Sequence, residues 1–166
     1  MARNVKTWPA IVCLLVAAGL EVMPLPDVLT PWRPPFAAIA LIYWVMMWPN
    51  RVNLGTAFII GLILDLLHGN LLGQNALSLS VITYLVMRFH LQIRIFPVWQ
   101  LMLTIFAMLA INAFIQLWID GVAGIPPAGI TRWTQVLSGT ILWPVLMGIM
   151  DWIRIGAERD NARFTY

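Results

Sequence analysis

Long apolar runs, separated by short stretches of charge and proline, cover most of the chain and predict membrane-spanning helices. The runs lie at residues 8–23, 36–48, 54–67, 76–89, 96–118 and 135–153. Several runs are shorter than the roughly 20 residues that cross a bilayer, so we expect their boundaries to shift by a few positions. The pattern therefore predicts an all-α, polytopic membrane protein with six transmembrane helices.

Prolines and tryptophans mark the same six helices. Ten of the eleven prolines lie at or beyond the predicted helix ends, where a missing N–H costs little. Pro144 lies inside the last run and predicts a kink there. Seven of the nine tryptophans fall near the ends, as in the aromatic belt at a membrane interface.

The composition agrees with a membrane protein. Apolar residues make up 61% of the 166 residues and charged residues 10%, and the mean hydropathy is +0.84. A soluble domain is nearer half apolar and a quarter charged, so this chain has too few charges to cover a water-facing surface. Residues 1–166 are thus predicted to form a single integral membrane domain, which excludes a separate nucleotide-binding or nuclease domain.

The basic residues fall singly between the runs, so the net charge of +3 indicates topology rather than nucleic-acid binding. One side of the predicted bundle holds eight of them: Arg3, Lys6, Arg51, Arg88, Arg94, Arg154, Arg159 and Arg163. The other side holds Arg33 and Arg132. Because cytoplasmic loops carry the excess of Lys and Arg, both termini are predicted to be cytoplasmic, with residues 154–166 as a short tail. The loop at 88–94 and the tail are expected to anchor against anionic lipid or, alternatively, to dock a partner.

The first run resembles a signal peptide, because Arg3 and Lys6 precede an apolar stretch. Five more runs follow, and Glu21 interrupts the expected cleavage zone. A retained first membrane helix is the favoured interpretation.

Asp65 is the clearest ionisable group inside a predicted span, where a charge is costly and faces the bundle interior. Ala57, Gly61 and Asp65 are four residues apart, so one helix face carries two small residues and the carboxylate and allows close helix packing. Gly69 and Gly73 bracket a tight turn just beyond. We expect Asp65 to accept N–H bonds from this turn or to pair with Arg33 or Arg132; proton or ion handling is the alternative.

A second polar stripe lies on the fifth run, where Asn112, Gln116 and Asp120 are again four residues apart. Arg132 follows at the start of the sixth run, and all of these lie at the predicted outer face. Three explanations remain open: hydrogen bonds between helices, a ligand cavity open to the outside, or a docking face for another membrane protein. The first is favoured because polar contacts between helices are common in bundles.

No catalytic or metal-binding constellation is evident in the sequence. His68 and His90 fall near opposite faces, Cys13 is alone, and no Gly-rich loop followed by Lys could hold a phosphate. The acidic residues of the runs are scattered singly. We therefore expect no enzyme activity, no cofactor and no metal.

Several blocks of sequence resemble the MreD family of rod shape-determining proteins. They are residues 32–36 running on to Tyr43 and Trp44, residues 49–56 with Arg51, the Gly61, Asp65, Gly69 and Gly73 block, Trp99-Gln100, and Leu142-Trp143-Pro144. The resemblance covers essentially the whole chain and looks closest to proteobacterial members. His68-Gly69-Asn70 stands where members of the family often have Ser-Gly-Ser, so the resemblance does not give the exact geometry of this turn.

This resemblance implies a non-enzymatic scaffold of the cell-wall elongation machinery in the bacterial inner membrane, which maintains rod shape. Its implied partners are the periplasmic membrane protein MreC and, directly or indirectly, the MreB filament, RodA, its penicillin-binding transpeptidase partner and RodZ. It also implies a fold similar to the substrate-binding (S-component) subunits of energy-coupling-factor transporters. The alternative is a small-molecule-binding transporter component with an outward polar pocket. The candidate structural or interaction residues are Arg33, Tyr43, Trp44, Arg51, Gly61, Asp65, Gly69, Gly73, Asn112, Gln116, Asp120, Arg132, Trp143 and Pro144.

Overall fold

The structure, a computed structural model, describes residues 8–24, 26, 30–126 and 129–163, without the side chains of 159–163. Arg3 and Lys6 of the charge count lie outside the described residues. The described part is all-helical, with six α-helices and a short 3-10 helix, η1 (Thr30–Trp32), which confirms the predicted fold class. The helices are α1 (Trp8–Val22), α2 (Phe36–Met47), α3 (Leu54–His68), α4 (Gln74–Ile93), α5 (Val98–Val122) and α6 (Gly129–Arg163).

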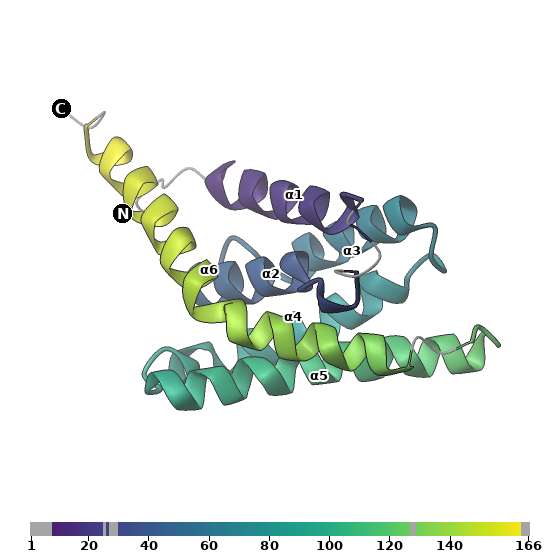
Figure 1. Cartoon of the computed structure of the whole chain (residues 1–166). Helices are drawn as coiled ribbons and strands as arrows, with labels where there is room; N and C mark the ends of the chain where they lie inside the picture. Colours follow the sequence, from purple (N-terminus) through teal and green to yellow (C-terminus); the bar gives the residue numbers. More distant parts are fainter. Residues whose placement is uncertain (1–7, 25, 27–29, 127–128, 164–166) are drawn as a thin grey trace.

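The α2 helix is the centre of the bundle. Every residue from Ala37 to Met46 is buried, so α2 is apolar and enclosed on all sides. It packs against α1, α4 and α6, while α3 pairs with α4 and α5 pairs with α6 (Figure 1). The remaining helices each bury one face and expose an apolar one, as helices facing lipid do.

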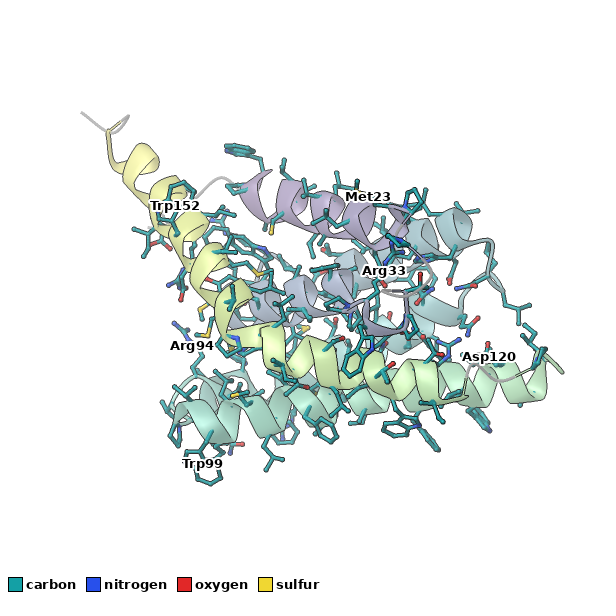
Figure 2. The ribbon with its side chains drawn as sticks, viewed as in Figure 1. Met23, Arg33, Arg94, Trp99, Asp120 and Trp152 are labelled. Carbon is teal, nitrogen blue, oxygen red and sulfur yellow. The ribbon has the colours of Figure 1, made fainter. Side chains whose placement is uncertain are left out.

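The two ends of the bundle carry different residues (Figure 2). Arg94, Trp99 and Trp152 lie at one end, and Met23, Arg33 and Asp120 lie at the other. We call the first the inner end and the second the outer end, after the orientation that the charge count predicts.

Local sequence explains where the short helices stop. Pro35 precedes α2, and Trp48-Pro49 follow it. The α3 helix begins after Asn53, whose side chain accepts hydrogen bonds from the backbone N–H groups of Gly55 and Thr56. It ends at Gly69, which has the left-handed φ of +65° that glycine adopts without strain.

Three helices reach several residues beyond the apolar runs. The α4 helix covers Gln74–Ile93 rather than 76–89, α5 covers Val98–Val122 rather than 96–118, and α6 covers Gly129–Arg163 rather than 135–153. Residues 88–93, predicted as part of a basic loop, therefore belong to α4. Residues 154–163, predicted as a tail, are therefore helical. An apolar run ends where a helix leaves the lipid. Residues 154–163 lie beyond that point and continue the helix, because they are rich in the good helix formers Ala, Arg and Glu. Pro144 lies inside α6, which changes direction partway along its length (Figure 1).

By length and composition, three described helices can cross a membrane, namely α4, α5 and α6 as far as residue 158. The α1 and α3 helices are apolar but shorter, with 15 described residues each, and α2 has 12. At 1.5 Å per residue, α2 and α3 are only about 18 and 22 Å long, against a hydrocarbon core of roughly 30 Å. The bundle is thus built from helices of unequal length.

Candidate functional site

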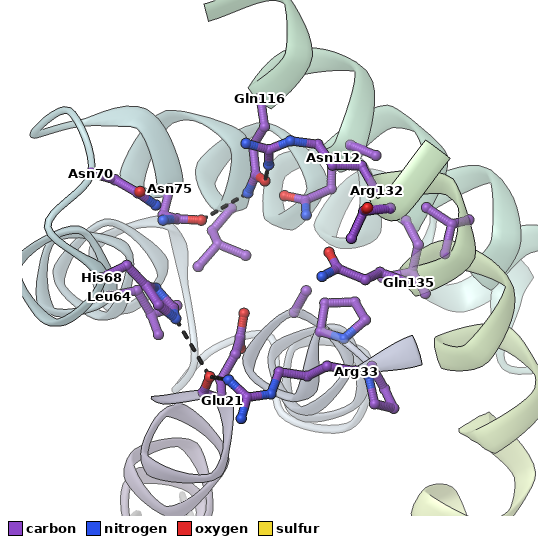
Figure 3. A pocket seen from close by; sticks show the side chains of 18 of the residues that line it. Glu21, Arg33, Leu64, His68, Asn70, Asn75, Asn112, Gln116, Arg132 and Gln135 are labelled. Carbon is purple, nitrogen blue, oxygen red and sulfur yellow. Dashed lines mark hydrogen bonds between the residues drawn. The ribbon is translucent and has the colours of Figure 1, made fainter. Parts of the chain in front are cut away.

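A pocket of about 330 Å³ lies at the outer end, where α1, η1, α3, α4, α5 and α6 meet (Figure 3). Polar side chains line it from several elements: Glu21, Arg33, Asn75, Asn112, Gln116 and Arg132. Four of these, Arg33, Asn112, Gln116 and Arg132, are candidates from the sequence. The polar side chains predicted at the outer face of the bundle therefore come together at this pocket.

Asp65 builds the corner between α3 and α4 beside this pocket, and its side chain is fully buried. Its carboxylate accepts hydrogen bonds from the backbone N–H groups of Gly73 and Asn75, both at 2.8 Å, and from Asn75 Nδ2 at 2.9 Å. These backbone donors belong to the start of α4, where Gly73 offers no side-chain cap of its own. The N-terminus of a helix also favours a negative charge. Asp65 thus caps α4 from the preceding helix, as the sequence predicted for the turn.

Gly61 lets α4 approach α3 closely enough for this cap to form. A Cβ at Gly61 would lie 2.3 Å from Ala76 Cα and 2.5 Å from Ala76 N, so no other residue fits without moving the backbone. Gly69 and Gly73, with φ of +65° and +101°, make the turn between the two helices. The close-packing face predicted from the sequence is confirmed by this contact.

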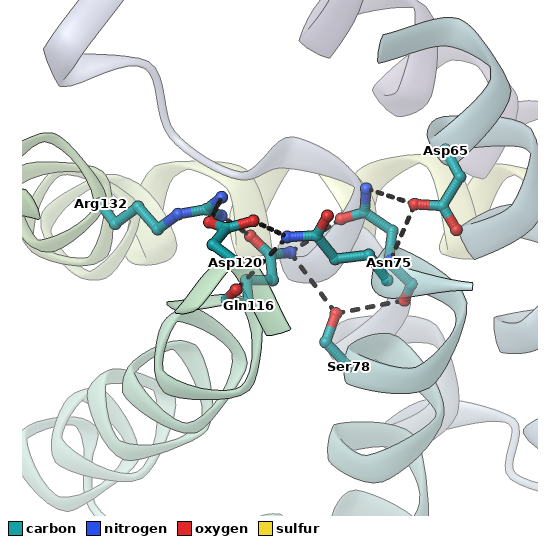
Figure 4. Close-up of polar contacts among 7 residues, drawn as sticks. Asp65, Asn75, Ser78, Gln116, Asp120 and Arg132 are labelled. Carbon is teal, nitrogen blue, oxygen red and sulfur yellow. Dashed lines mark hydrogen bonds and ion pairs between the residues drawn. The ribbon is translucent and has the colours of Figure 1, made fainter. Parts of the chain in front are cut away.

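A row of hydrogen bonds continues from Asp65 across the pocket wall (Figure 4). Gln116 Nε2 donates to Asn75 Oδ1 at 2.7 Å, and Arg132 donates to Gln116 Oε1. Arg132 also pairs with Asp120 at 2.6 Å. The row joins α3, α4, α5 and α6, so the favoured explanation for the stripe, hydrogen bonds between helices, holds for these residues.

The partner of Asp65 is therefore neither arginine considered from the sequence. Arg132 is held by Asp120 and Gln116. Arg33 donates to the backbone carbonyl oxygens of Glu21 and Met23 and so caps the C-terminus of α1. A carboxylate with several backbone donors at a helix start needs no second charge, which explains the difference.

Three polar residues of this site were missed by sequence reasoning. Gln74 Nε2 donates to the buried Asp120 at 2.7 Å, and Asn75 links Asp65 to Gln116. Both lie between the predicted turn, which ends at Gly73, and the fourth run at 76–89, and received no role; their place directly after Gly73 was the available signal. Glu21 accepts from Ala37 N at 3.0 Å at the start of α2, a long-range contact with no local sequence signal.

Several buried polar atoms at the pocket lack a hydrogen-bond partner. Asn112 is 6% exposed and its Oδ1 is unpartnered, as are the Nε atoms of Arg33 and Arg132. An unsatisfied buried polar atom is costly, so such atoms indicate a place where a further polar group binds. Asn112, Arg33 and Arg132 all line the pocket, so their unpartnered atoms lie in its wall.

A second cluster ties α2 to α6 toward the inner end. The Tyr43 hydroxyl donates to Asp151 Oδ1 at 2.5 Å, and Arg154 pairs with Asp151 at 3.0 Å. Tyr43 also makes an edge-to-face contact with Trp44, with ring centroids 5.4 Å apart. The contact fixes α6 beyond the bend, so Tyr43 and Trp44 stabilise the bundle away from the pocket.

The other candidates lie apart from the pocket. Trp143 is almost fully buried in α6, next to Pro144, and Arg51 lies in the turn between α2 and α3. No group of three His, Cys, Asp or Glu side chains that could hold a metal ion occurs among the described residues.

Comparisons with known proteins agree with each other. A family model described as rod shape-determining protein MreD matches residues 2–153. The rod shape-determining protein MreD of Haemophilus influenzae is 30% identical to this chain over 158 residues, which cover 92% of this chain and 94% of that protein. No solved structure matches the chain.

Proposed function

The chain belongs to the MreD family of rod shape-determining proteins, and from this premise we propose that it is a non-enzymatic scaffold of the cell-wall elongation machinery. Family membership gives it a role in determining rod shape within the Mre system. Its long apolar helices make it a membrane protein. The proposal adds that it crosses the bacterial inner membrane several times, with both termini in the cytoplasm and the outer end facing the periplasm.

We propose that the outer pocket binds a periplasmic membrane partner of the MreC type. The observation that carries this proposal is the unpartnered Oδ1 of Asn112, buried in the wall of a pocket that Arg33 and Arg132, each with an unpartnered Nε, also line. A polar segment of a partner, close to the membrane surface, carries the donors and acceptors that these atoms need. The exposed apolar faces of α1 and α5 are suited to lipid or to a partner's own transmembrane helix.

The same scaffold is proposed to link peptidoglycan synthesis to the cytoplasmic filament. In this proposal RodA, its penicillin-binding transpeptidase partner, RodZ and MreB associate with it directly or through the MreC-like protein. The exposed basic residues Arg88 and Arg94, at the inner end, support a role for that surface beside the cytosol.

Depletion of the gene in its rod-shaped host tests the scaffold function. Rod-shaped cells are expected to become round, and expression of the wild-type chain is expected to restore their width. Rod shape retained for several generations after the protein has disappeared would contradict the proposal.

A second candidate function is a small-molecule-binding membrane component. The pocket volume of about 330 Å³ favours it, because this lies at the lower limit for small-molecule sites. A ligand bound to the folded state raises the melting temperature of purified protein. A panel of vitamins and lipid-linked cell-wall precursors tests it, and no thermal shift across the panel would leave the scaffold as the sole function.

A further inference from the structure

The outer pocket changes from polar to apolar with depth. The α5 helix runs from the inner to the outer end, and its lining residue Leu109 lies seven residues, or about 10 Å, deeper than Gln116. The α4 helix runs the opposite way, and its lining residue Leu79 lies four residues, or about 6 Å, deeper than Asn75. Lining residues on α3 and α6 follow the same order, so the pocket has a polar rim and an apolar floor. The floor consists of Ala38, Leu64, Leu79, Leu109 and Val136.

The charged side chains that line the pocket already have partners. Arg132 pairs with Asp120 at 2.6 Å, and Arg33 donates to two backbone carbonyl oxygens at the end of α1. The Glu21 carboxylate accepts from Ala37 N at the start of α2. The two arginines are thus balanced by the two carboxylates of Glu21 and Asp120. A charged occupant would bring an unpaired charge into this balanced site, and an unpaired buried charge is costly.

Two neutral amides remain for an occupant. The side chains of Asn112 and Gln135 reach into the pocket from α5 and α6 (Figure 3). Neither side chain makes a hydrogen bond within the described part of the chain. Each amide carries both donors and an acceptor, which match the C=O and N–H of a peptide group. A peptide group is uncharged, so it satisfies these amides and keeps the charge balance of the pocket.

The depth and the volume of the pocket favour a side chain over a lipid chain. Leu64, Leu79 and Leu109 are only 1–2% exposed, so the floor rests on the packed core of the bundle. The floor lies about 10 Å below the rim, whereas the chains of one leaflet extend over about 15 Å, half of the hydrocarbon core. The volume of about 330 Å³ equals that of about eleven water molecules at roughly 30 Å³ each. One large side chain with its flanking peptide groups fits this space, and a two-chain lipid does not.

We propose that the outer pocket is a socket for one apolar side chain of a partner polypeptide. The side chain, of the size of leucine, fills the floor, and the peptide groups on either side of it bond to the amides of Asn112 and Gln135. The inserted segment is uncharged. This inference rests on the proposed function, because it names the part of the partner that the pocket takes.

Capped amino acids test the socket without any partner. N-acetyl-leucinamide carries an apolar side chain between two peptide groups. N-acetyl-glycinamide lacks the side chain, and the corresponding lysine and glutamate derivatives carry a charge. Thermal unfolding of the purified full chain in dodecyl maltoside micelles measures binding, because a ligand of the folded state raises the melting temperature. At about ten times its Kd, a probe is expected to raise it by about 3–6 °C.

A filled pocket is the matched negative variant. Ala113 lines the pocket from α5, so Ala113→Leu occupies the space that the probe needs. Ala107→Leu, on the same helix, is exposed and outside the pocket, and controls for effects of the probe on the micelle. If Ala113→Leu does not fold, Val136→Ile replaces it and adds a methyl group at the floor.

The socket predicts which probes and variants respond. We expect N-acetyl-leucinamide to stabilise the wild type and Ala107→Leu, and to leave Ala113→Leu unchanged. The glycine, lysine and glutamate derivatives are expected to give no shift. An equal shift with any of these three, or no shift with the leucine derivative, overturns the proposal. A shift with hexyl glucoside but not with the leucine derivative would assign the pocket to a lipid-like molecule instead.

Co-purification of the partner separates this inference from the proposed function. If the leucine derivative does not bind, while the partner is retained by the wild type and lost from Asn112→Leu, only the socket is refuted. If the leucine derivative binds as expected to a chain that retains no MreC-like partner, the socket is supported and the proposed partner is refuted.

Discussion

Replacing Asp65 tests whether its carboxylate holds the α3–α4 corner. Asp65→Leu removes both oxygens and leaves three close donors, the N–H groups of Gly73 and Asn75 and the Asn75 amide, without an acceptor. Each buried donor left unpaired costs about 1–3 kcal/mol, so the total is roughly 3–9 kcal/mol. This is comparable with the whole stability of an ordinary domain, roughly 5–15 kcal/mol.

Asp65→Asn removes less of the cap. The remaining carbonyl oxygen can accept from both donors of Asn75, and the new amide group faces the N–H of Gly73. One donor then stays unpaired, so the expected cost is about 1–3 kcal/mol. The two substitutions should therefore differ clearly in the stability of the folded protein.

Thermal unfolding in detergent micelles, together with rescue of cell width in a depletion strain, measures both effects. Leu66→Met is the matched control, because Leu66 is the next residue, is 69% exposed and takes no part in the cap. The expected order of melting temperature is wild type and Leu66→Met, then Asp65→Asn, then Asp65→Leu. Equal loss in the Asn and Leu variants would instead show that the charge itself is required, and an unchanged Asp65→Leu protein would refute the capping argument.

Two further pairs of variants test the packing. Gly61→Ala should destabilise the folded protein by roughly 3 kcal/mol or more, because the new Cβ meets the backbone of α4. The control Gly148→Ala, with open space around it, should leave stability unchanged or raise it by up to about 1 kcal/mol. Equal melting temperatures of the two variants would contradict the close approach of α3 and α4. Tyr43→Phe removes a hydrogen bond to the carboxylate of Asp151 and should lower the free energy of unfolding by about 1.5–3 kcal/mol. The control Tyr84→Phe, at a position 60% exposed, should leave the melting temperature unchanged. A Tyr43→Phe protein as stable as wild type would show that this contact does not stabilise α6.

The number and type of the helices could be predicted because apolar runs, prolines and tryptophans all respond to the bilayer. The helix ends were less predictable, because apolar runs, prolines and tryptophans mark the edge of the lipid, whereas a helix can continue beyond that edge. In α6 the helix continues past residue 153 on helix-forming polar residues. In α4 it begins at Gln74, on two polar residues that lie between the predicted turn and the fourth apolar run.

At the site, spacing alone was enough to place Asn112, Gln116 and Asp120 on one face and Gly61 with Asp65 on another. The bonds between these faces could not be predicted, because they are set by tertiary packing. Asn75 illustrates this, because its side chain accepts a hydrogen bond from Gln116, which lies 41 residues further along the chain. The choice of Asp120 as the partner of Arg132 likewise depends on how α5 and α6 pack.

Binding of the MreC-like partner to a pocket variant tests the central proposal most directly. Asn112→Leu removes the unpartnered Oδ1 and breaks no hydrogen bond among the described residues, so the variant should fold normally. Phe114→Leu, two residues away and 64% exposed, is the matched control outside the pocket. We expect wild type and Phe114→Leu to co-purify with the partner in equal amounts, and Asn112→Leu to retain less than about a tenth, the loss that corresponds to about 1.4 kcal/mol or more. Undiminished co-purification with Asn112→Leu, or no co-purification with the wild type, would contradict the account.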